Sequence, residues 1–479
     1  MTDVVLPLLV ACPLVGAAIA LVAGRLYRGL DWYVGFVALA VEAGLVVGAT
    51  RSYLASGRLS HEVGGVPPAY GIELAFDGLS LPVAALVSGV ALSVLVYTRY
   101  SGPRGPAFHS AYLLLAGGLM GVTVTADAFN LYVFIEITGL AAYALVASRG
   151  DGASAYAALK YLVVGTVGAS LYLVGVAYVF VATGTLNMAW ASERLSEVGY
   201  TDPVVVASFC FVVVGLAVKT ALYPLHSWQP DAYSAAPVAV AGYVAALVST
   251  VAAYALARVL FTVYTPEFLS AVPLASTAVV YLACVSVVAG ATLAVVQTDV
   301  RRMLAYSSVS QFGMVIAGFA VANPTAAFGA LIHLVGHGVA KGGAFLGVGL
   351  MSSDGDVDGL SGLGRTSPGS SAAFTVLLLT LIGVPPTVGF VGKWYMAVGA
   401  FQGDRPVVAV VVVVSTLLTL AYAARLIDRM YYGSPATAAD GGRRSPAVAV
   451  VALAAAVAVA LGLLAGEMEA ALALEEVLG

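Results

Sequence analysis

The chain has 479 residues, of which 61% are hydrophobic and only 10% charged, and its mean hydropathy is +0.98. This composition excludes a soluble globular domain and is typical of a protein that crosses a lipid bilayer many times. The formal net charge of −4 reflects nearly balanced acidic and basic residues and argues against a nucleic-acid partner.

The first apolar segment, residues 4–24, is long enough to cross a bilayer. Asp3 precedes this segment, whereas Arg25 and Arg28 follow it, so it lacks the basic start of a secretory signal peptide. We therefore expect a first transmembrane helix that is retained in the protein.

Thirteen further apolar segments follow, each bounded by charged residues, glycine or proline. They cover residues 31–53, 77–98, 107–126, 128–148, 155–182, 204–230, 234–263, 272–296, 303–322, 325–351, 372–401, 406–432 and 446–466. Each has about the 20 residues that a bilayer requires. Pro224 interrupts the seventh span, and Pro385 and Pro386 interrupt the twelfth. The sequence thus predicts an all-α polytopic membrane protein with about 14 transmembrane helices in one transmembrane domain, residues 1–479.

The 17 arginines predict how the chain is oriented in the membrane, because twelve fall on one side of the predicted spans and five on the other. The larger set is Arg25, Arg28, Arg99, Arg104, Arg149, Arg301, Arg302, Arg365, Arg425, Arg429, Arg443 and Arg444, and the smaller set is Arg51, Arg58, Arg194, Arg258 and Arg405. Basic residues are enriched in cytoplasmic loops, so we assign the larger set to the cytoplasm. Both termini of this multi-pass protein are then expected on the outer face of the cell (inner or plasma) membrane.

Only four lysines are present, and all of them fall inside predicted spans: Lys160, Lys219, Lys341 and Lys393. A charged side chain at bilayer depth costs roughly 3 kcal/mol on insertion scales, so such residues are normally retained for a role. A buried lysine can exchange its proton, whereas arginine stays protonated. This usage favours proton transfer. The alternative is a compositional bias that leaves four lysines extending toward the membrane surface.

The order of the lysines predicts an internal repeat. Lys160 and Lys219 lie in spans six and seven, and Lys341 and Lys393 lie in spans eleven and twelve. Because the offset of five spans is odd, the two halves would be inverted relative to each other, each with one broken helix. Residues 1–103 then hold three N-terminal helices, residues 104–263 and 272–432 hold two inverted five-helix repeats, and residues 446–479 hold a C-terminal helix and a short acidic tail.

The first broken segment, residues 215–237, carries Lys219, Pro224 and His226. Proline removes a backbone donor and frees a carbonyl group, which a membrane protein tolerates only beside other protein groups or water. Glu136, near the middle of span five, is expected to pair with Lys219 and to hold it charged, so that loss of the pair releases a proton. The alternative is a static buried ion pair that only fixes helix packing.

His333, His337 and Lys341 are spaced at i, i+4 and i+8, which places them on one helical face. Histidine titrates near neutral pH, so this stripe is predicted to relay protons. Buried histidines without a relay role and a zinc site are the alternatives. The residues between the histidines lack the glutamate of the H-E-x-x-H motif, so no metal is expected.

Lys393 follows the second helix break, where freed carbonyl groups and water are expected close to its amine. Polar side chains near residue 306 can hydrogen-bond an internal water chain or join helices together. They are Tyr306, Ser307, Ser308, Ser310 and Gln311.

Three other groups of residues are less informative. Glu42 lies in the middle of the second span, outside the repeats. It is either an intramembrane site or a contact for a neighbouring subunit, unless the bounds of that span are misplaced. Asp77 is expected to cap a helix at the membrane interface. The isolated cysteines Cys12, Cys210 and Cys284 fit small buried hydrophobic residues, and no nucleotide or flavin motif is present. No cofactor is therefore expected on this chain, and any redox energy has to come from another one.

Several stretches resemble the antiporter-like subunits of respiratory complex I, the Mrp cation/proton antiporters and membrane-bound hydrogenases. They are KTALYPLHSWQPDAYSAAP, FNLYVFIE, QTDVRRMLAYSSVSQFGMV, HLVGHGVAKGGAFL and GVPPTVGFVGKW, and the likeness extends over residues 75–430. FNLYVFIEITGLAAYALVA and ATGTLNMA are most similar to the D-type component of Mrp antiporters and to the related hydrogenase subunits.

The resemblance implies a fourteen-helix fold with two inverted repeats and a central axis of glutamate and lysine. It places the functional positions on Glu136, Lys219, Lys341, His337 and Lys393. Lys160, His226 and Thr250 are predicted as auxiliary residues. The sequence departs from the family at Thr250 in LVSTVAAYAL, where a lysine is common, which weakens the expected link between the two half-paths. The family's long C-terminal lateral helix has no counterpart in the acidic tail.

The leading functional prediction is a proton-translocating subunit of a multisubunit Na⁺/H⁺ antiporter, similar to the D-type component of Mrp. Its implied partners are other membrane subunits, the lipid bilayer, protons and, through the complex, Na⁺. One alternative is a proton-pumping membrane subunit of a redox complex, either complex I or a membrane-bound hydrogenase. Others are a proton channel that energises an uptake partner, and a structural subunit with an incomplete path.

Overall fold

A computed structural model describes residues 2–351, 355–434 and 445–472, which are mostly α-helical. The first half contains α1 (Thr2–Leu26), α2 (Leu30–Ser56), α3 (Ser80–Tyr100), α4 (Pro106–Val124), α5 (Ala128–Ala147), α6 (Gly152–Thr183), α7 (Met188–Val198), α8 (Pro203–Thr220), α9 (Trp228–Ala235), α10 (Val238–Val259) and α11 (Thr265–Ala271). The second half contains α12 (Pro273–Val295), α13 (Val300–Ala320), α14 (Pro324–Met351), α15 (Leu363–Thr366), α16 (Pro368–Ile382), α17 (Val388–Gln402), α18 (Pro406–Tyr432), α19 (Ser445–Leu463) and α20 (Ala465–Leu472). Short 3₁₀ turns η1 (Val63–Gly65) and η3 (Asp358–Leu360) and the π-turn η2 (Leu260–Tyr264) complete the helical segments.

Thirteen of the described helices are long and apolar enough to cross a membrane. α16 and α17, each of 15 residues, together supply one further crossing that is broken in the middle. The prediction of an all-α polytopic membrane protein with about 14 crossings is confirmed.

Two small elements outside the bilayer were not predicted. Strands β1 (Leu59–Glu62) and β2 (Glu73–Phe76) pair antiparallel with Leu59 opposite Phe76. α7 is a short helix between α6 and α8, with charged residues along its exposed side. Both are too short and too polar to appear in a search for 20-residue apolar runs.

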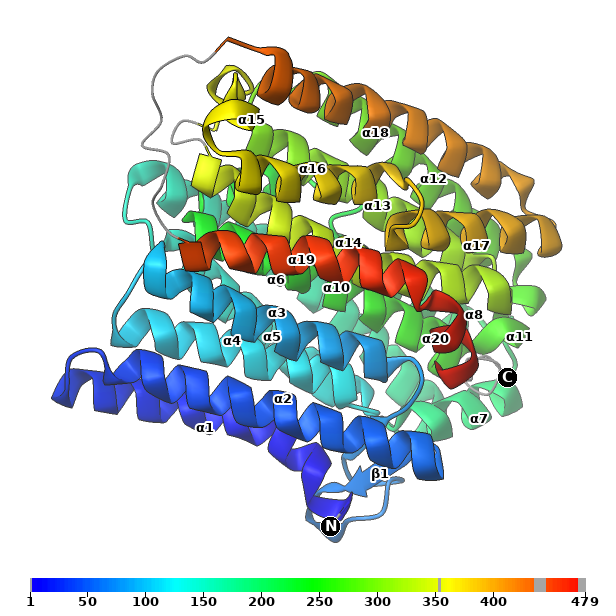
Figure 1. Cartoon of the computed structure of the whole chain (residues 1–479). Coiled ribbons are helices and arrows are strands. Elements are labelled where there is room, and N and C mark those ends of the chain that lie inside the picture. Colours follow the sequence, from blue (N-terminus) through cyan, green and yellow to red (C-terminus); the bar gives the residue numbers. More distant parts are fainter. Residues whose placement is uncertain (1, 352–354, 435–444, 473–479) are drawn as a thin grey trace.

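The helices pack side by side in roughly chain order, from α1 and α2 at one edge to α18 at the other (Figure 1). α10 occupies the centre, and its most apolar 18-residue window is entirely buried. α19 returns across the bundle and packs against α3, α14 and α16. The start of α1, the β-hairpin, α7 and α20 share one side of the bundle, as Figure 1 shows.

Close helix packing fixes the position of the first broken segment. A Cβ atom at Gly215 in α8 would lie 2.5 Å from the backbone nitrogen of Tyr172 in α6. Only glycine therefore allows the two backbones to approach this closely. The contact holds the end of α8, which carries Lys219, against the middle of α6.

The cysteine prediction is only partly correct. Cys284 is buried and Cys12 half-buried, but Cys210 is exposed on the surface of α8. A free cysteine on an apolar helix surface can face lipid as readily as it faces the protein core.

Candidate functional site

The first helix break is closed by local backbone bonds and one tryptophan. Ala221 adopts the left-handed conformation with a φ of 62°, and Leu222 donates its N–H to the carbonyl of Ala217 over 3.0 Å. The indole Nε1 of Trp228 donates to the carbonyl of Val218, also at 3.0 Å. Without these bonds, the carbonyl groups at the end of α8 would have no hydrogen-bond donor in the membrane interior.

Lys219 is the second-last residue of α8, and its side chain is 8% exposed. Its Nζ lies 3.3 Å from Oε1 of Glu136 on α5, as the sequence predicted, and 3.4 Å from the hydroxyl of Tyr143. The C-terminal carbonyl groups of a helix carry partial negative charge, which further stabilises the positively charged Lys219 amine. Tyr143 was not predicted, although it follows Glu136 by seven residues and so shares its helical face.

The second break builds a lysine site from backbone carbonyls. α16 ends at Ile382, and Gly383 takes the left-handed conformation with a φ of 89°. From α17, the Nζ of Lys393 donates to the carbonyls of Leu381 and Ile382 at 3.1 and 2.9 Å. Thr416 Oγ1 on α18 accepts a third bond at 3.2 Å. Carbonyls freed by the break hold the lysine amine, and no carboxylate within the described ranges forms an ion pair with it.

The two breaks share one backbone pattern. In each, a residue in the left-handed conformation is followed by a residue whose N–H donates to the carbonyl five positions earlier. At the first break the left-handed residue is Ala221, with Leu222 donating to Ala217; at the second it is Gly383, with Val384 donating to Leu379. Both are Schellman-type helix ends. The predicted inverted repeat is compatible with this pattern and stays a prediction.

The three predicted relay residues of α14 face α13. Lys341 is completely buried and donates to the carbonyl of Leu304 at 2.6 Å and to Ser307 Oγ. His333 Nε2 lies 2.7 Å from Gln311 Oε1.

His337, between these two residues, has no hydrogen-bond partner for either ring nitrogen among the described residues, and Phe312 meets its ring edge-on at 4.8 Å. Both ring nitrogens of this buried imidazole are thus uncommitted and could bond with water or with a neighbouring proton carrier. Among the described residues no group of three or more His, Cys, Asp or Glu side chains could hold a metal.

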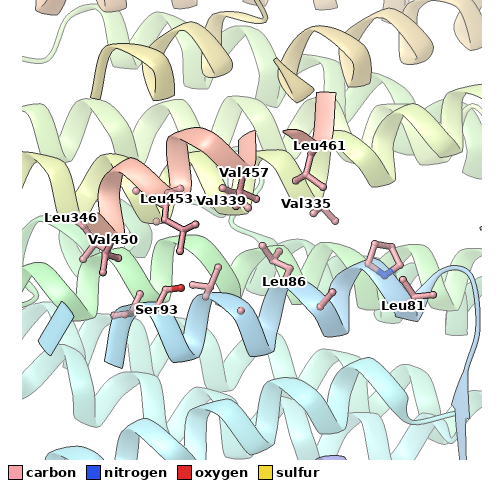
Figure 2. Close-up of a pocket in the computed structure, with 18 of the residues that line it drawn as sticks. Leu81, Leu86, Ser93, Val335, Val339, Leu346, Val450, Leu453, Val457 and Leu461 are labelled. Carbon is pink, nitrogen blue, oxygen red and sulfur yellow. The ribbon is translucent and has the colours of Figure 1, made fainter. Parts of the chain in front are cut away.

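The opposite face of α14 is apolar. Val335, Val339 and Leu346 line a groove of about 340 Å³ between α3, α14 and α19 (Figure 2). α14 therefore separates a polar interface with α13 from an apolar groove, which keeps the buried amine away from lipid.

Thr250 belongs to α10, which packs against both α8 and α14, the helices that carry Lys219 and Lys341. It is fully buried, and its hydroxyl has no hydrogen-bond partner within the described part of the chain. Beside Lys219, a cavity of about 20 Å³ is lined by Val248 and Val251 of α10, among others. This volume accommodates about one water molecule.

The auxiliary residues Lys160 and His226 lie outside the buried row. Lys160 is 27% exposed and pairs with Asp231 of α9 at 2.7 Å; Asp231 also binds Arg302 of α13 at 2.8 Å. Lys160 lies inside the span of α6, as predicted, and its amine reaches a polar cluster that joins three helices. His226 stacks on Tyr223 with ring centroids 5.3 Å apart. Asp231 escaped prediction because its partners are 71 residues away on either side.

Two buried acids lie apart from the lysines. Asp77 caps α3, as predicted, and also forms a buried bidentate pair with Arg258 at 2.6 and 2.8 Å, which was not predicted. Burial alone would raise the pKa of Asp77, but the Arg258 guanidinium and the Ser80 amide lower it to about 2. Glu42 is completely buried in α2, and neither carboxylate oxygen has a partner in the described structure. It is thus an interior residue of this chain and not a surface contact.

Comparison with known proteins places this geometry in a family. Residues 125–419 match the family described as NADH:quinone oxidoreductase/Mrp antiporter, TM. The chain belongs to this family. The matched region includes both helix breaks, Glu136, Lys219, Thr250, the α14 stripe and Lys393.

Curated relatives come from both branches of the family. NADH-quinone oxidoreductase subunit N of Desulforudis audaxviator is 41% identical over 426 residues, which cover 86% of this chain and 84% of the relative. The D-type component of the Na⁺/H⁺ antiporter of Bacillus subtilis is 28% identical over 406 residues, covering 83% of this chain and 81% of the relative. The resemblance deduced from the motifs is confirmed, but the antiporter branch is not singled out within the family.

Solved structures agree on the fold. A chain of the archaeal membrane-bound sulfane sulfur reductase superposes with a TM-score of 0.92 at 27% identity, covering 99% of this chain and 98% of that one. A chain of the Mrp complex from Dietzia superposes at 0.87 with 24% identity, covering 99% of both chains, and shows the fold alone. Chains of very similar shape thus occur in different multisubunit membrane complexes.

Proposed function

We propose that this chain moves protons across the membrane as one subunit of a multisubunit complex, using a row of buried amines. The Lys219–Glu136 pair at the end of the broken α8 carries this proposal, because it joins a buried cation to a carboxylate where the helix is interrupted. Lys341 and Lys393 continue the row with only neutral hydrogen-bond acceptors.

The proposed switch is the separation of Lys219 from Glu136. While the carboxylate is close, it favours the charged amine; when it moves away, only Tyr143 and the helix carbonyls remain, and the desolvated amine releases its proton. The released proton would pass to water in the small cavity beside Lys219 and then, past Thr250 of α10, to His337. His337 can accept it because neither ring nitrogen is already committed to a protein partner among the described residues.

The energy source differs between two settings. A redox complex is favoured by the 41% identical relative named as an NADH-quinone oxidoreductase subunit and by the fit to the sulfane sulfur reductase chain. An Na⁺/H⁺ antiporter of the Mrp kind is supported by two relatives named as Na⁺/H⁺ antiporter subunits, at 28% and 30% identity. In either setting the partners are other membrane subunits, and the coupling chemistry lies on them.

The proton-transfer proposal is tested in inverted membrane vesicles that contain the whole complex. Lys219→Met and Glu136→Gln are each expected to abolish the pH change driven by the complex, because each removes half of the switch. Arg194→Gln, which alters a surface pair on α7, is the matched control and is expected to leave it unchanged. Normal proton movement in both switch variants would leave a structural subunit as the better explanation.

The setting is tested by purifying the complex in mild detergent and identifying its subunits. Iron–sulfur or flavin absorbance, with electron transfer to an acceptor, would establish the redox setting and overturn the antiporter one. A colourless set of membrane subunits that exchanges Na⁺ for protons would do the reverse.

A further inference from the structure

A pocket with three arginines in its lining lies where α1 and α3 end, at the opposite end of the bundle from the β-hairpin. It has a volume of about 550 Å³ and is formed by the α1–α2 turn, the end of α3 and the start of α4. Arg28, Arg99 and Arg104 line it together with Trp32 and His109. None of these residues has a part in the proposed proton path.

The three arginines give the pocket an unbalanced positive charge. None of them pairs with a carboxylate in the described structure. The acid in the lining, Asp31, is already bound by His109 Nδ1 at 2.6 Å. Three arginines and one aspartate give the lining a net formal charge of about +2 when the histidine is neutral, which favours an anionic ligand.

The side chains are held in place before any ligand arrives. The guanidinium of Arg99 lies 5.3 Å from the ring centroid of Trp32, and the Trp32 indole donates to the carbonyl of Leu95 at 3.1 Å. Arg104 donates to the backbone carbonyl of Arg99 at 2.9 Å. Both arginines thus have one contact each at the pocket and keep further N–H donors available for a ligand.

A buried donor or acceptor also remains unused in the pocket wall. His109 is 2% exposed, and its Nε2 has no hydrogen-bond partner among the described residues. A buried polar atom without a partner costs free energy unless a ligand or water satisfies it. Because this nitrogen is itself buried, it does not contact a ligand in the pocket directly, and the three arginines are the groups that select an anion.

We propose that this pocket binds the phosphate of an anionic glycerophospholipid. The pocket lies where α1 and α3 end and α2 and α4 begin, which is the headgroup level of a bilayer. Trp32 and Tyr33 supply the aromatic residues typical of that level, and exposed apolar side chains of α1 and α2 continue below it for the acyl chains. Basic pockets between transmembrane helices on the cytoplasmic side are suited to such headgroups. Free inorganic phosphate shares the headgroup chemistry but gains nothing from the apolar surface.

Native mass spectrometry of the purified, delipidated full-length protein tests the assignment, using phosphatidylglycerol and phosphatidylcholine as probes. Phosphatidylglycerol is expected to stay bound, and phosphatidylcholine to bind more weakly. Arg28→Gln and Arg99→Gln should each weaken phosphatidylglycerol binding about fivefold, as expected for one basic residue near a membrane surface. Arg28 is exposed and makes no ion pair within the described ranges, so we expect its replacement to leave the fold intact.

Arg25→Gln is the matched control, since Arg25 lies three residues from Arg28 at the same helix end but outside the pocket lining. It should leave binding unchanged, and Arg99→Lys should retain most of it. Equal retention of both lipids, or equal weakening by Arg25→Gln, would overturn the proposal. Displacement of phosphatidylglycerol by millimolar inorganic phosphate would assign the site to free phosphate and overturn the lipid source.

Discussion

At the scale of single residues, the four lysines occupy three different environments. Lys160 reaches a half-buried polar cluster, Lys219 faces a carboxylate, and Lys341 and Lys393 face only neutral oxygens. The cost of burying an amine differs accordingly, because a carboxylate offsets desolvation far more than carbonyl dipoles do. The burial of a charged amine is therefore least offset at Lys341 and Lys393, the two lysines without a carboxylate partner.

Lys393 offers a test of the carbonyl site. Lys393→Arg keeps the positive charge permanently, and we expect it to block proton release although the carbonyls of Leu381 and Ile382 can still bind it. Proton movement in vesicles is expected to fall to the level of Lys393→Met. Thr416→Val, which removes only the third acceptor, is the control and should cost no more than about fivefold. Activity retained by the arginine variant would contradict proton release from this residue.

The Asp77–Arg258 pair predicts a stability effect with a defined pH range. Asp77→Asn should destabilise the protein by about 3–5 kcal/mol, because it leaves a buried arginine without its partner. The pKa of Asp77 is lowered to about 2 in the folded protein, compared with about 3.9 when unfolded. The stabilisation is therefore fully present above about pH 4 and is lost only as the pH falls through about 2.

Thermal unfolding in detergent at pH 5 and pH 8 measures this effect. The loss of stability caused by Asp77→Asn should be equal at the two pH values. The double variant Asp77→Asn, Arg258→Gln should recover part of that stability. Glu197→Gln, at an exposed pair, should change little. A loss that appears at pH 8 but not at pH 5 would contradict the lowered pKa.

Sequence spacing predicted contacts along one helix far better than contacts between helices. The row of His333, His337 and Lys341 on α14 follows from their i, i+4 spacing. Glu136 could be paired with Lys219 because charged side chains inside a membrane usually pair with an opposite charge. Asp231, Tyr143 and the Asp31–His109 pair were missed. Their partners lie on other helices, and nothing in one sequence fixes the rotation of one helix against another.

At the scale of elements, the breaks in α8–α9 and α16–α17 place lysines near helix C-termini. Lys219 belongs to the end of its own half-helix, whereas Lys393 reaches back from the second half to the end of the first. The prolines predicted that both helices are interrupted, but the direction from which each lysine approaches depends on backbone geometry. α10 fills the space between the breaks with an uninterrupted, buried helix.

Thr250 on α10 tests whether water joins the two half-paths. Thr250→Val keeps the shape and removes the hydroxyl, so a water chain that uses it should lose about one hydrogen bond, and proton movement should fall about fivefold. Thr250→Ser retains the hydroxyl and is expected to keep most of the activity. If valine and serine act alike, the path avoids Thr250. Thr250→Lys is then the stronger probe, since added activity would show that a carrier is missing.

At the scale of the whole molecule, the fourteen crossings place the start of α1 and the helix α20 on one side (Figure 1). This arrangement agrees with the even number of predicted spans, and contacts near the C-terminus support it. Tyr53 at the end of α2 donates to the carbonyl of Leu472, and Tyr395 donates to Glu469 at 2.8 Å. Which side faces the cytoplasm follows only from the arginine count and stays a prediction.

Labelling from one side of the membrane tests this orientation. In a background with Cys12, Cys210 and Cys284 replaced by alanine, single cysteines are placed at two exposed positions, Ser196 in α7 and Ser434 after α18. A membrane-impermeant maleimide should label Ser196→Cys in right-side-out vesicles and Ser434→Cys only in inverted ones, because the arginine-rich side is predicted to be cytoplasmic. The reverse pattern would invert the topology. It would also move the arginine pocket to the outer leaflet, where anionic lipid is scarcer, so the same measurement bears on the proposed lipid site.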